Sequence, residues 1–382
     1  MKKILAATLA VSLICPTCCA AGVSAPPSIS ASSAILMDAE SGRVLYEKDV
    51  HTRRLIASTT KLMTALVAVE STPRLEKVIT VKPEYQAEGS SMYLKAGEEL
   101  TLKDLLYGLL LQSGNDAALA IAGGCAGTVE TFVEWMNQWA EDIGMFDSHF
   151  VNPNGLDDEE HYSTAYDMAL LGREVLKNEV LREIISTKSI TVAGRSLTNH
   201  NKLLWQYEGC EGMKTGYTMS AGRTLVSCAT RNGQTLICVT LHDPDDWDDH
   251  KALLDYGFEN WTAHPLTRPG KTFRMVPVNG SLLPWAPVEV ECGLVYPLTV
   301  KERVRVRVSL PEQAEAPIRK GTVAGKLTFM VGEETGWETY LLYASDIPAD
   351  PGRPTLFQQV KELLRGGEGR TSLAAFWLRT GG

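Results

Sequence analysis

The spacing of apolar residues predicts a cluster of helices in the first half of the chain. From Leu62 to Val69 apolar residues recur on one helical face, and the run stops at Ser71-Thr72-Pro73, where proline cannot continue a helix. A motif resembling a capping box at Thr101 opens a second apolar helix. This second helix covers residues 101–111, and helical spacing is found in three further segments, residues 116–126, 128–143 and 164–177.

Strand-like runs on both sides of this helical region predict an antiparallel sheet. Residues 34–38 and 43–47 flank a Glu-Ser-Gly turn and predict a hairpin. Residues 223–229 and 234–241 are joined by an Asn-Gly turn, which predicts that they continue an antiparallel meander. A final helix at about residues 250–258 closes this unit.

The pattern changes character after residue 260. Short alternating strands with many prolines and glycines follow to about residue 345, which predicts a separate small all-β domain. The amphipathic tail is too short and too charged to span a bilayer, and it could lie at a membrane surface, fold onto its own domain or be disordered. We therefore expect four segments: a leader (1–25), a larger domain (26–260), a β-rich domain (261–348) and a tail (349–382).

The first residues have the pattern of a secretory signal. Met1-Lys2-Lys3 is basic, and the apolar run from Ile4 to Ile14 is too short to be a stable span. Cleavage is expected between Ala20 and Ala25, and the cysteines at 15, 18 and 19 form no convincing lipid-attachment signal. We expect the mature protein to be exported and to work outside the cytoplasmic membrane.

The charge balance argues against a nucleic-acid partner. The 382 residues carry 37 Lys and Arg against 46 Asp and Glu, a formal net charge of -9. No basic stripe with interleaved aromatic residues is present to follow a phosphate backbone. We therefore predict that the chain binds no nucleic acid.

The cysteines and acidic residues give no sign of a metal centre. Three of the eight cysteines lie in the predicted leader, and the other five are widely spaced without a Cys-x-x-Cys pair. Cys228 and Cys238 fall in apolar strand-like runs, so we expect them to be small buried hydrophobes. The acids of the loop 152–161 do not follow the order of an EF-hand loop, which indicates a solvated loop. We predict no metal and no cofactor.

Ser58 and Lys61 form the first candidate for chemistry. A serine and a lysine three residues apart lie on one helical face, so the amine can reach the hydroxyl. Burial beside the apolar run after Lys61 would lower the pKa of the amine and let it act as a base. In the first turn, the backbone N–H of Ser58 is unpaired and points at developing negative charge. The alternative is an N-capped surface helix.

Two more polar groups lie at points where elements meet. Ser113-Gly114-Asn115 falls between two apolar helical runs, so Ser113 and Asn115 lie on a tight turn. Helix capping by Asn115 or Asp116 is the alternative for that turn. Lys214-Thr215-Gly216 opens a strand after a Gly-Met pair. None of these motifs is specific when it stands alone.

Together, and in this order, the three motifs resemble the signature of the penicillin-binding proteins. The chain resembles the low-molecular-mass members of that group, the serine D-alanyl-D-alanine carboxypeptidases, from about Ala34 to Phe258 and into the β-rich domain. His161 to Ala169 and Asn199 to Trp205 also carry the resemblance. It implies an α+β fold of the β-lactamase/transpeptidase type, in which an antiparallel sheet packs on a helical cluster. It also implies a location in the cell wall or on the outer face of the membrane.

The resemblance implies a role for each motif residue in acylation. Ser58 would attack the carbonyl between two terminal D-alanines of a peptidoglycan stem, and neutral Lys61 would accept its proton. Ser113 would pass a proton to the leaving amine, and Asn115 would hydrogen-bond the substrate amide. The same serine would be acylated by β-lactam antibiotics.

The residues of the third motif would bind the substrate. Lys214 would supply positive charge that keeps Lys61 neutral and attracts the anionic peptide end. Thr215 would offer its hydroxyl to the terminal carboxylate, and Gly216 would let the substrate backbone come close. The backbone N–H of Tyr217, with that of Ser58, would hold the oxyanion.

Several alternatives stay open at this point. The arginine that some family members use to hold the substrate carboxylate has an acidic stretch, residues 243–249, in its place, and Arg223 or Lys202 could substitute. Residues 199–205 could serve the site or only pack at the sheet edge. An endopeptidase, a β-lactamase and a non-catalytic penicillin sensor are the rival functions, although the extra β-rich domain fits a wall enzyme better than a β-lactamase.

Overall fold

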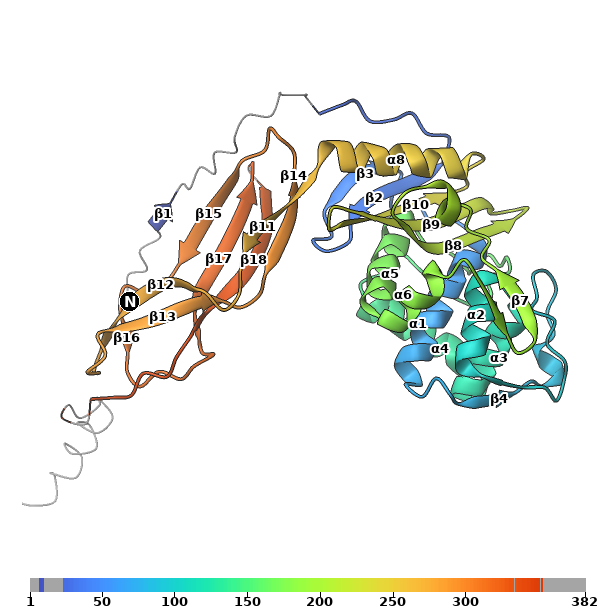
Figure 1. The fold of residues 1–382 in the computed structure, drawn as a ribbon, viewed down its shortest axis with the longest axis horizontal. Helices are drawn as coiled ribbons and strands as arrows, with labels where there is room; N and C mark the ends of the chain where they lie inside the picture. The colour runs from blue at the N-terminus through green and yellow to red at the C-terminus, as the bar shows by residue number, and fades with distance from the viewer. Residues whose placement is uncertain (1–6, 10–22, 333, 351, 353–382) are drawn as a thin grey trace, which may run out of the picture. The chain divides into compact units, whose positions relative to one another are not determined.

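The computed structural model describes residues 7–9, 23–332, 334–350 and 352. The chain divides into two compact units, one of residues 19–264 with 295–301 and one of residues 1–18, 265–294 and 302–382 (Figure 1). The domain boundaries expected at 25, 260 and 348 remain predictions. Most of the leader and nearly all of the tail lie outside the described residues.

The first unit is organised around a five-stranded antiparallel sheet of order β3-β2-β10-β9-β8. The predicted hairpin and the predicted meander are confirmed, and the turn between β9 and β10 has both Asn232 (φ 52°) and Gly233 (φ 79°) in the left-handed region. The strands are β2 (Ser33–Asp38), β3 (Val44–Lys48), β8 (Cys210–Thr218), β9 (Gly222–Arg231) and β10 (Gln234–Leu241).

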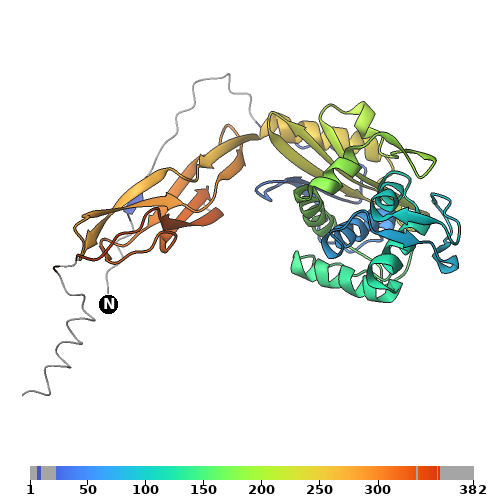
Figure 2. The ribbon, with the colours of Figure 1, turned by 60° about the horizontal axis from the view of Figure 1, so that its bottom comes forward.

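Helices cover both faces of this sheet, with α8 on one side and the other long helices on the opposite side (Figures 1 and 2). All the predicted helices are present. The helices are α1 (Lys61–Ser71), α2 (Leu102–Leu111), α3 (Asn115–Ala126), α4 (Val129–Asp142), α5 (Ala165–Lys177), α6 (Glu179–Ser186), α7 (Leu203–Gln206) and α8 (Asp246–Asn260), with short turns η1 (Ala57–Thr60) and η2 (Pro83–Tyr85).

Alternate residues of β10 pack into two separate hydrophobic cores. Ile237 and Val239 pack with the helical cluster, whereas Leu236 and Cys238 pack with α8. A strand buried on both faces reads as a continuous apolar run, which is the pattern seen in the sequence. The sheet is therefore the middle layer of this unit.

Local signals explain where the helices begin. The Thr101 hydroxyl accepts a hydrogen bond from the backbone N–H of Asp104, so the predicted cap of α2 is confirmed. Thr128 and Thr164 cap α4 and α5 in the same way. Two small ribbons complete this unit, one formed by β4 (Val78–Thr80) with β5 (Glu99–Thr101) and one by β6 (Ser189–Val192) with β7 (Arg195–Thr198). The helices α6 and α7 and the β6–β7 ribbon were not predicted from the sequence.

The second unit is all β in its described residues, as predicted. Its sheet has the order β1-β15-β17-β18-β13-β12-β16, and β11 pairs with β14 in a two-stranded ribbon. The strands are β1 (Ala7–Leu9), β11 (Thr262–Thr267), β12 (Thr272–Asn279), β13 (Trp285–Val290), β14 (Leu294–Leu298), β15 (Val304–Ser309), β16 (Ala314–Glu315), β17 (Val323–Val331) and β18 (Glu334–Tyr343). No helix among the described residues has the length and apolar character needed to cross a bilayer.

The five cysteines that the structure describes are all unpaired. Cys228 and Cys238 are fully buried in the sheet, so the prediction of small buried hydrophobes is confirmed. Cys125 and Cys210 are half-buried, and Cys292 is exposed. The five described thiols therefore fall into three classes of burial.

Candidate active site

The nucleophile candidate lies at the junction of two helical segments. Ser58 is in the 3-10 turn η1, and Lys61 is the first residue of α1, so the pair spans a tighter helix than we expected. Ala57, just before Ser58, has φ 48°, a left-handed conformation that is costly for a residue with a Cβ. The surrounding contacts must therefore hold this turn in place.

Lys61 is fully buried and makes three polar contacts through its amine. Nζ lies 2.8 Å from Ser58 Oγ, 2.8 Å from Asn115 Oδ1 and 2.5 Å from the carbonyl oxygen of Asn154. The two oxygens of Asn115 and Asn154 can only accept. A neutral amine that donates to both keeps its lone pair for the proton of Ser58.

The electrostatics of the site favour that neutral amine. Burial holds the pKa of Lys61 well below its usual range, and the nearby positive charge of Lys214 lowers it further. The carboxylate of Asp116 opposes both effects. Desolvation and a like charge therefore outweigh one acid, and the lysine can serve as a base.

Asn115 is held in one orientation at the start of α3. Its Nδ2 donates to the carbonyl of Glu88 at 2.5 Å, which turns Oδ1 toward Lys61. Its backbone N–H donates to the carbonyl of Ser90 at 2.7 Å. Ser113 is buried in the turn before it, with φ 61°. The loop of residues 86–94 thus sets the position of one partner of Lys61.

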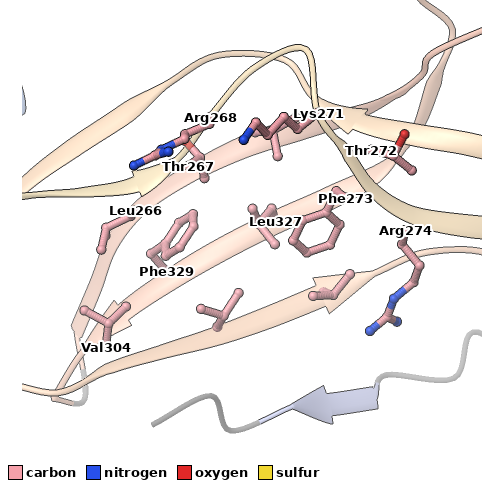
Figure 3. A pocket seen from close by; sticks show the side chains of 13 residues that line it. Leu266, Thr267, Arg268, Lys271, Thr272, Phe273, Arg274, Val304, Leu327 and Phe329 are labelled. Carbon is pink, nitrogen blue, oxygen red and sulfur yellow. The ribbon is translucent and has the colours of Figure 1, made fainter. Parts of the chain in front are cut away.

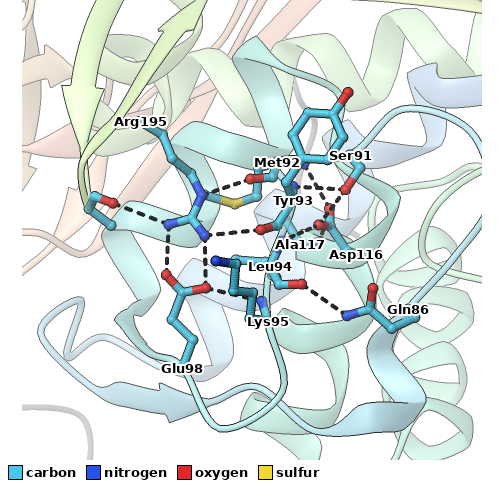
Figure 4. A network of polar contacts seen from close by, with 11 residues as sticks. Gln86, Ser91, Met92, Tyr93, Leu94, Lys95, Glu98, Asp116, Ala117 and Arg195 are labelled. Carbon is cyan, nitrogen blue, oxygen red and sulfur yellow. Dashed lines mark hydrogen bonds and ion pairs between the residues drawn. The ribbon is translucent and has the colours of Figure 1, made fainter.

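A network of polar contacts anchors that loop (Figure 4). Asp116 accepts hydrogen bonds from the Ser91 hydroxyl at 2.6 Å and from the backbone N–H of Met92 at 3.0 Å. Arg195 donates to the carbonyl of Met92 at 2.7 Å and pairs with both carboxylate oxygens of Glu98 at 2.8 and 2.7 Å. Asp116 therefore anchors the loop, and its charge also raises the pKa of Lys61.

The third motif lies on β8, beside the turn that carries Ser58. Lys214 is buried, its Nζ donates to the carbonyl of Thr215 at 2.7 Å, and burial lowers its pKa to about 7. A Cβ on Gly216 would come within 2.9 Å of the backbone nitrogen of Ser58, so only glycine allows this approach. The side chain of Tyr217 is exposed.

The loop of residues 152–161 differs from the solvated loop that we predicted. Its acidic residues 157–160 are exposed, but residues 153–155 are buried against the nucleophile turn. Asn154 gives its carbonyl to Lys61, and a Cβ on Gly155 (φ 82°) would come within 1.9 Å of the carbonyl oxygen of Ala57. The prediction was wrong for this part because tertiary packing, which the local composition does not reveal, buries it.

His161 supports the same turn from the end of that loop. The backbone N–H of Val151 donates to Nδ1 at 3.2 Å, so Nε2 carries the proton and donates to the Thr60 hydroxyl at 2.8 Å. That hydroxyl donates in turn to the carbonyl of Ala57 at 2.8 Å. Burial lowers the pKa of His161 to about 4, which keeps it neutral. This chain of hydrogen bonds holds Ala57 in its left-handed conformation.

Residues 199–205 build a loop of their own. Asn199 donates to the carbonyls of Ile185 and Thr187 at 3.2 and 3.1 Å, and its Oδ1 accepts from the backbone N–H of Asn201 at 2.9 Å. These contacts are those expected of a packing role.

The two candidate carboxylate holders lie on one aromatic ring. Arg223 pairs with Asp246 at 2.9 Å and lies 5.6 Å from the centre of the Trp247 ring. The amine of Lys202 lies 6.0 Å from the same ring. Arg223 is thus already paired with an acid.

The structure brings the predicted site residues together to different degrees. Ser58, Lys61 and Asn115 are in direct hydrogen-bond contact, and Gly216 touches the backbone of Ser58. Within the described chain, the side chains of Ser113, Thr215 and Tyr217 make no hydrogen bond, so they are free to meet a ligand. Asn154 and His161 are positioning groups that spacing alone did not reveal; only the resemblance drew attention to His161.

Comparisons with known proteins identify the family of this chain. The family model described as D-alanyl-D-alanine carboxypeptidase matches residues 20–245, and the model of the penicillin-binding protein 5 C-terminal domain matches residues 291–349. The chain is 32% identical over 317 residues to D-alanyl-D-alanine carboxypeptidase DacF of Bacillus subtilis, covering 78% of this chain and 80% of the relative.

Solved structures show the same fold. Penicillin-binding protein 5 of Haemophilus influenzae matches with a TM-score of 0.77 and 30% identity, over 85% of this chain and 99% of that one. The DD-transpeptidase of Streptomyces K15 matches with a TM-score of 0.59 and 33% identity, over 62% of this chain and 100% of that one. The expected α+β fold is confirmed, and the chain belongs to the D-alanyl-D-alanine carboxypeptidase family of serine peptidases.

Proposed function

We propose that this protein removes the terminal D-alanine from peptidoglycan pentapeptide stems through an ester on Ser58. One observation carries the proposal: the buried amine of Lys61 has two of its three partners restricted to accepting, and the third is the hydroxyl of Ser58 at 2.8 Å. An arrangement of this kind activates a weak nucleophile without a histidine or a metal.

In the acylation step, Ser58 Oγ bonds to the carbonyl carbon between the two D-alanines, and its proton moves to Lys61. The resulting oxyanion lies between the backbone N–H groups of Ser58 and Tyr217, each worth about 3 kcal/mol in comparable enzymes. The C–N bond then breaks, and the proton passes through the hydroxyl of Ser113 to the leaving amine.

Hydrolysis of the ester completes the cycle. Water attacks the acyl carbon, its proton goes to Lys61, and Ser58 Oγ leaves with a proton returned to it. Asn115 Nδ2 uses one hydrogen on Glu88, so its second hydrogen is available to the carbonyl of the substrate amide. Lys214 and the hydroxyl of Thr215 bind the terminal carboxylate.

β-Lactams follow the same first step. Ser58 opens the four-membered ring, and the leaving amine stays tethered in the site, so the adduct persists. A fast β-lactamase needs a further base for water. Glu174 and Asn178 have a Glu-x-x-x-Asn spacing, but Glu174 pairs with Lys177 at 2.6 Å and Asn178 caps α6, so they do not supply that base.

The leader pattern and the wall substrate together support an exported enzyme in the cell wall or on the outer face of the cytoplasmic membrane. The tail of residues 349–382 lies largely outside the described residues. Peripheral contact of this tail with the membrane, packing on its own domain and disorder remain its three alternatives.

The first test is D-alanine release from a muramyl pentapeptide, with intact-mass detection of a penicillin adduct, for the wild type and Ser58→Ala. We expect both signals from the wild type and neither from the variant. A Ser58-dependent adduct without release would point to an endopeptidase or a sensor. Rapid turnover of penicillin would indicate a β-lactamase, and no adduct would overturn the proposal.

A further inference from the structure

β15 (Val304–Ser309) is the last strand of its sheet apart from one very short neighbour. That neighbour is β1, which pairs antiparallel with β15 in the register Ala7–Val308, Thr8–Arg307 and Leu9–Val306. On its other side β15 pairs along its full length with β17. If the predicted leader is removed on export, the outer backbone groups of β15 are left without partners.

A cavity opens along the inner face of the same strand (Figure 3). Its volume is about 420 Å³, and apolar side chains line its interior. Those of β15 and β17 are Val304, Val306, Val308, Leu327 and Phe329. A strand added to β15 would place every second residue on the face that carries these valines. The outer edge of β15 and the apolar space therefore lie side by side.

Positive charge surrounds the cavity and covers the other face of the strand. Arg268, Lys271 and Arg274 lie at its rim (Figure 3). On the opposite face of β15, Arg305 and Arg307 alternate with the valines and are exposed. A segment that pairs with β15 would meet arginines at the positions between its apolar residues.

We propose that the edge of β15 and the adjoining cavity form a docking site for an extended segment of a partner polypeptide. The segment is aliphatic at every second position and acidic at the positions between. Main-chain hydrogen bonds to β15 supply affinity, while the cavity and the arginines select the sequence. The proposal does not depend on the carboxypeptidase activity.

The observed pairing of β1 with β15 makes an extended peptide the favoured occupant of this edge. β1 shows that an extended segment fits the edge, whereas an acyl chain would leave the backbone groups of β15 without partners. The protein's own tail is disfavoured by charge, because residues 353–382 hold five basic and two acidic side chains and would face the same arginines. An acidic segment from another protein satisfies both conditions.

The test uses a labelled peptide with the sequence of residues 3–12 and fluorescence anisotropy on residues 26–382, the predicted mature chain. We expect saturable binding to this chain and weaker binding to the full chain, whose own residues 7–9 occupy the edge. Backbone amides of residues 304–309 should gain protection from hydrogen exchange when the peptide binds. Prolines at peptide positions 7 and 8 should abolish binding, since one of them must face β15.

A charge swap tests the register without disturbing the core. Peptide position 8 lies opposite Arg307, so Thr8→Glu in the peptide should bind about two- to fivefold tighter than the parent and Thr8→Lys weaker by a similar factor. With the exposed variant Arg307→Glu this order should reverse. Penicillin acylation of Ser58, measured on the same samples, should not change.

Three results would overturn the proposal. The first is no binding of any of the peptides to the chain of residues 26–382. The second is binding that ignores the prolines or the charge swap, which would mean non-specific adsorption. The third is binding of phosphatidylglycerol vesicles, lost in Lys271→Glu, without binding of the peptides, which would assign the cavity to a lipid.

Discussion

Two buried lysines, both with lowered pKa values, lie at the centre of the site. Lys61 is surrounded by acceptors and has a pKa held well below its usual range, whereas Lys214 has a pKa of about 7. The charge of Lys214 is therefore expected to respond to pH near neutrality. Each lysine makes a distinct prediction.

Replacing Lys61 by arginine should abolish its action as a base while keeping a cation. A guanidinium does not lose its proton in proteins, so it cannot accept that of Ser58. We expect the rate of penicillin acylation to fall by about 10²- to 10⁴-fold. Stopped-flow or intact-mass kinetics would measure it, with thermal unfolding as the control for folding. A loss of less than tenfold would contradict the role of Lys61.

Replacing Asn115 by aspartate should shift the pH dependence of acylation. A carboxylate at the position of Oδ1, 2.8 Å from Nζ, favours the charged form of Lys61 and raises its pKa. We expect the acidic limb of the acylation profile to move up by about 1 to 3 pH units. Asn115→Ala is the control, because it removes the acceptor without adding charge and should lower the rate without that shift.

The affinity for an anionic peptide end should weaken as pH rises through about 7. Lys214 has a lowered pKa of about 7, so it is cationic below that pH and neutral above it. KM for a D-Ala-D-Ala peptide should therefore rise between pH 6 and pH 9. In Lys214→Arg the charge persists over that range, and the rise should disappear. A flat KM in the wild type would refute this assignment.

At the scale of elements, the turn of Ser58 is held between a loop and a strand. Gly155, in the loop, lies close to the carbonyl of Ala57. Gly216, in the strand, lies close to the backbone of Ser58. His161 holds the same carbonyl through Thr60. The left-handed conformation of Ala57 is thus determined by contacts from distant parts of the chain.

Gly155→Ala should disrupt this arrangement. The added Cβ would come within 1.9 Å of the carbonyl oxygen of Ala57, so the turn must move and acylation should fall by more than about tenfold. Gly194→Ala is the matched control. Gly194 also has a positive φ (72°), but a Cβ there meets nothing within 4 Å, so backbone strain is added without a collision. Equal losses of acylation in both variants would mean that strain alone is responsible.

Elements with strong local signals could be predicted from the sequence, and elements fixed by tertiary contacts could not. The periodicity of apolar residues and the helix caps predicted α1 to α5, and the Asn-Gly turn predicted the β9–β10 hairpin. The short helix α6 and the β6–β7 hairpin were missed because their runs are brief and mixed.

The candidate site shows the same division. Ser58, Lys61 and Asn115 carry chemistry in their side chains, so motif spacing could single them out. Asn154 contributes only a backbone carbonyl, 93 residues away from Lys61, and no side-chain pattern reports that. The role of His161 depends on two hydrogen-bond partners brought together by folding.

At the scale of the whole molecule, a short segment from beyond residue 264 belongs to the first unit. Residues 295–301 pack with it, where Arg43 donates to the carbonyl of Pro297 at 2.6 Å and lies 5.3 Å from the ring of Tyr296. The Streptomyces DD-transpeptidase matches only 62% of this chain but over its own full length. The full length of that DD-transpeptidase therefore corresponds to only part of this chain.

A fragment of residues 26–264 should keep its penicillin acylation, because it contains all the candidate site residues. Its melting temperature should be lower, since losing the contacts of Arg43 costs about 1–2 kcal/mol, or roughly 2–8 °C. Arg43→Ala in the full chain is the matched control and should lower the melting temperature by a similar amount. A fragment that folds but is not acylated would show that the second unit is needed for the site.

The difference in burial among the described cysteines allows selective labelling of one thiol. Burial raises the pKa of Cys228 and Cys238 well above the usual range and that of Cys210 to about 11, so these thiols stay protonated and shielded at neutral pH. Cys292 alone is exposed among the described cysteines. On the chain of residues 26–382, which lacks the leader cysteines, a maleimide dye should therefore label the β-rich unit at Cys292, so that the tumbling of this unit can be followed separately from the chemistry at Ser58.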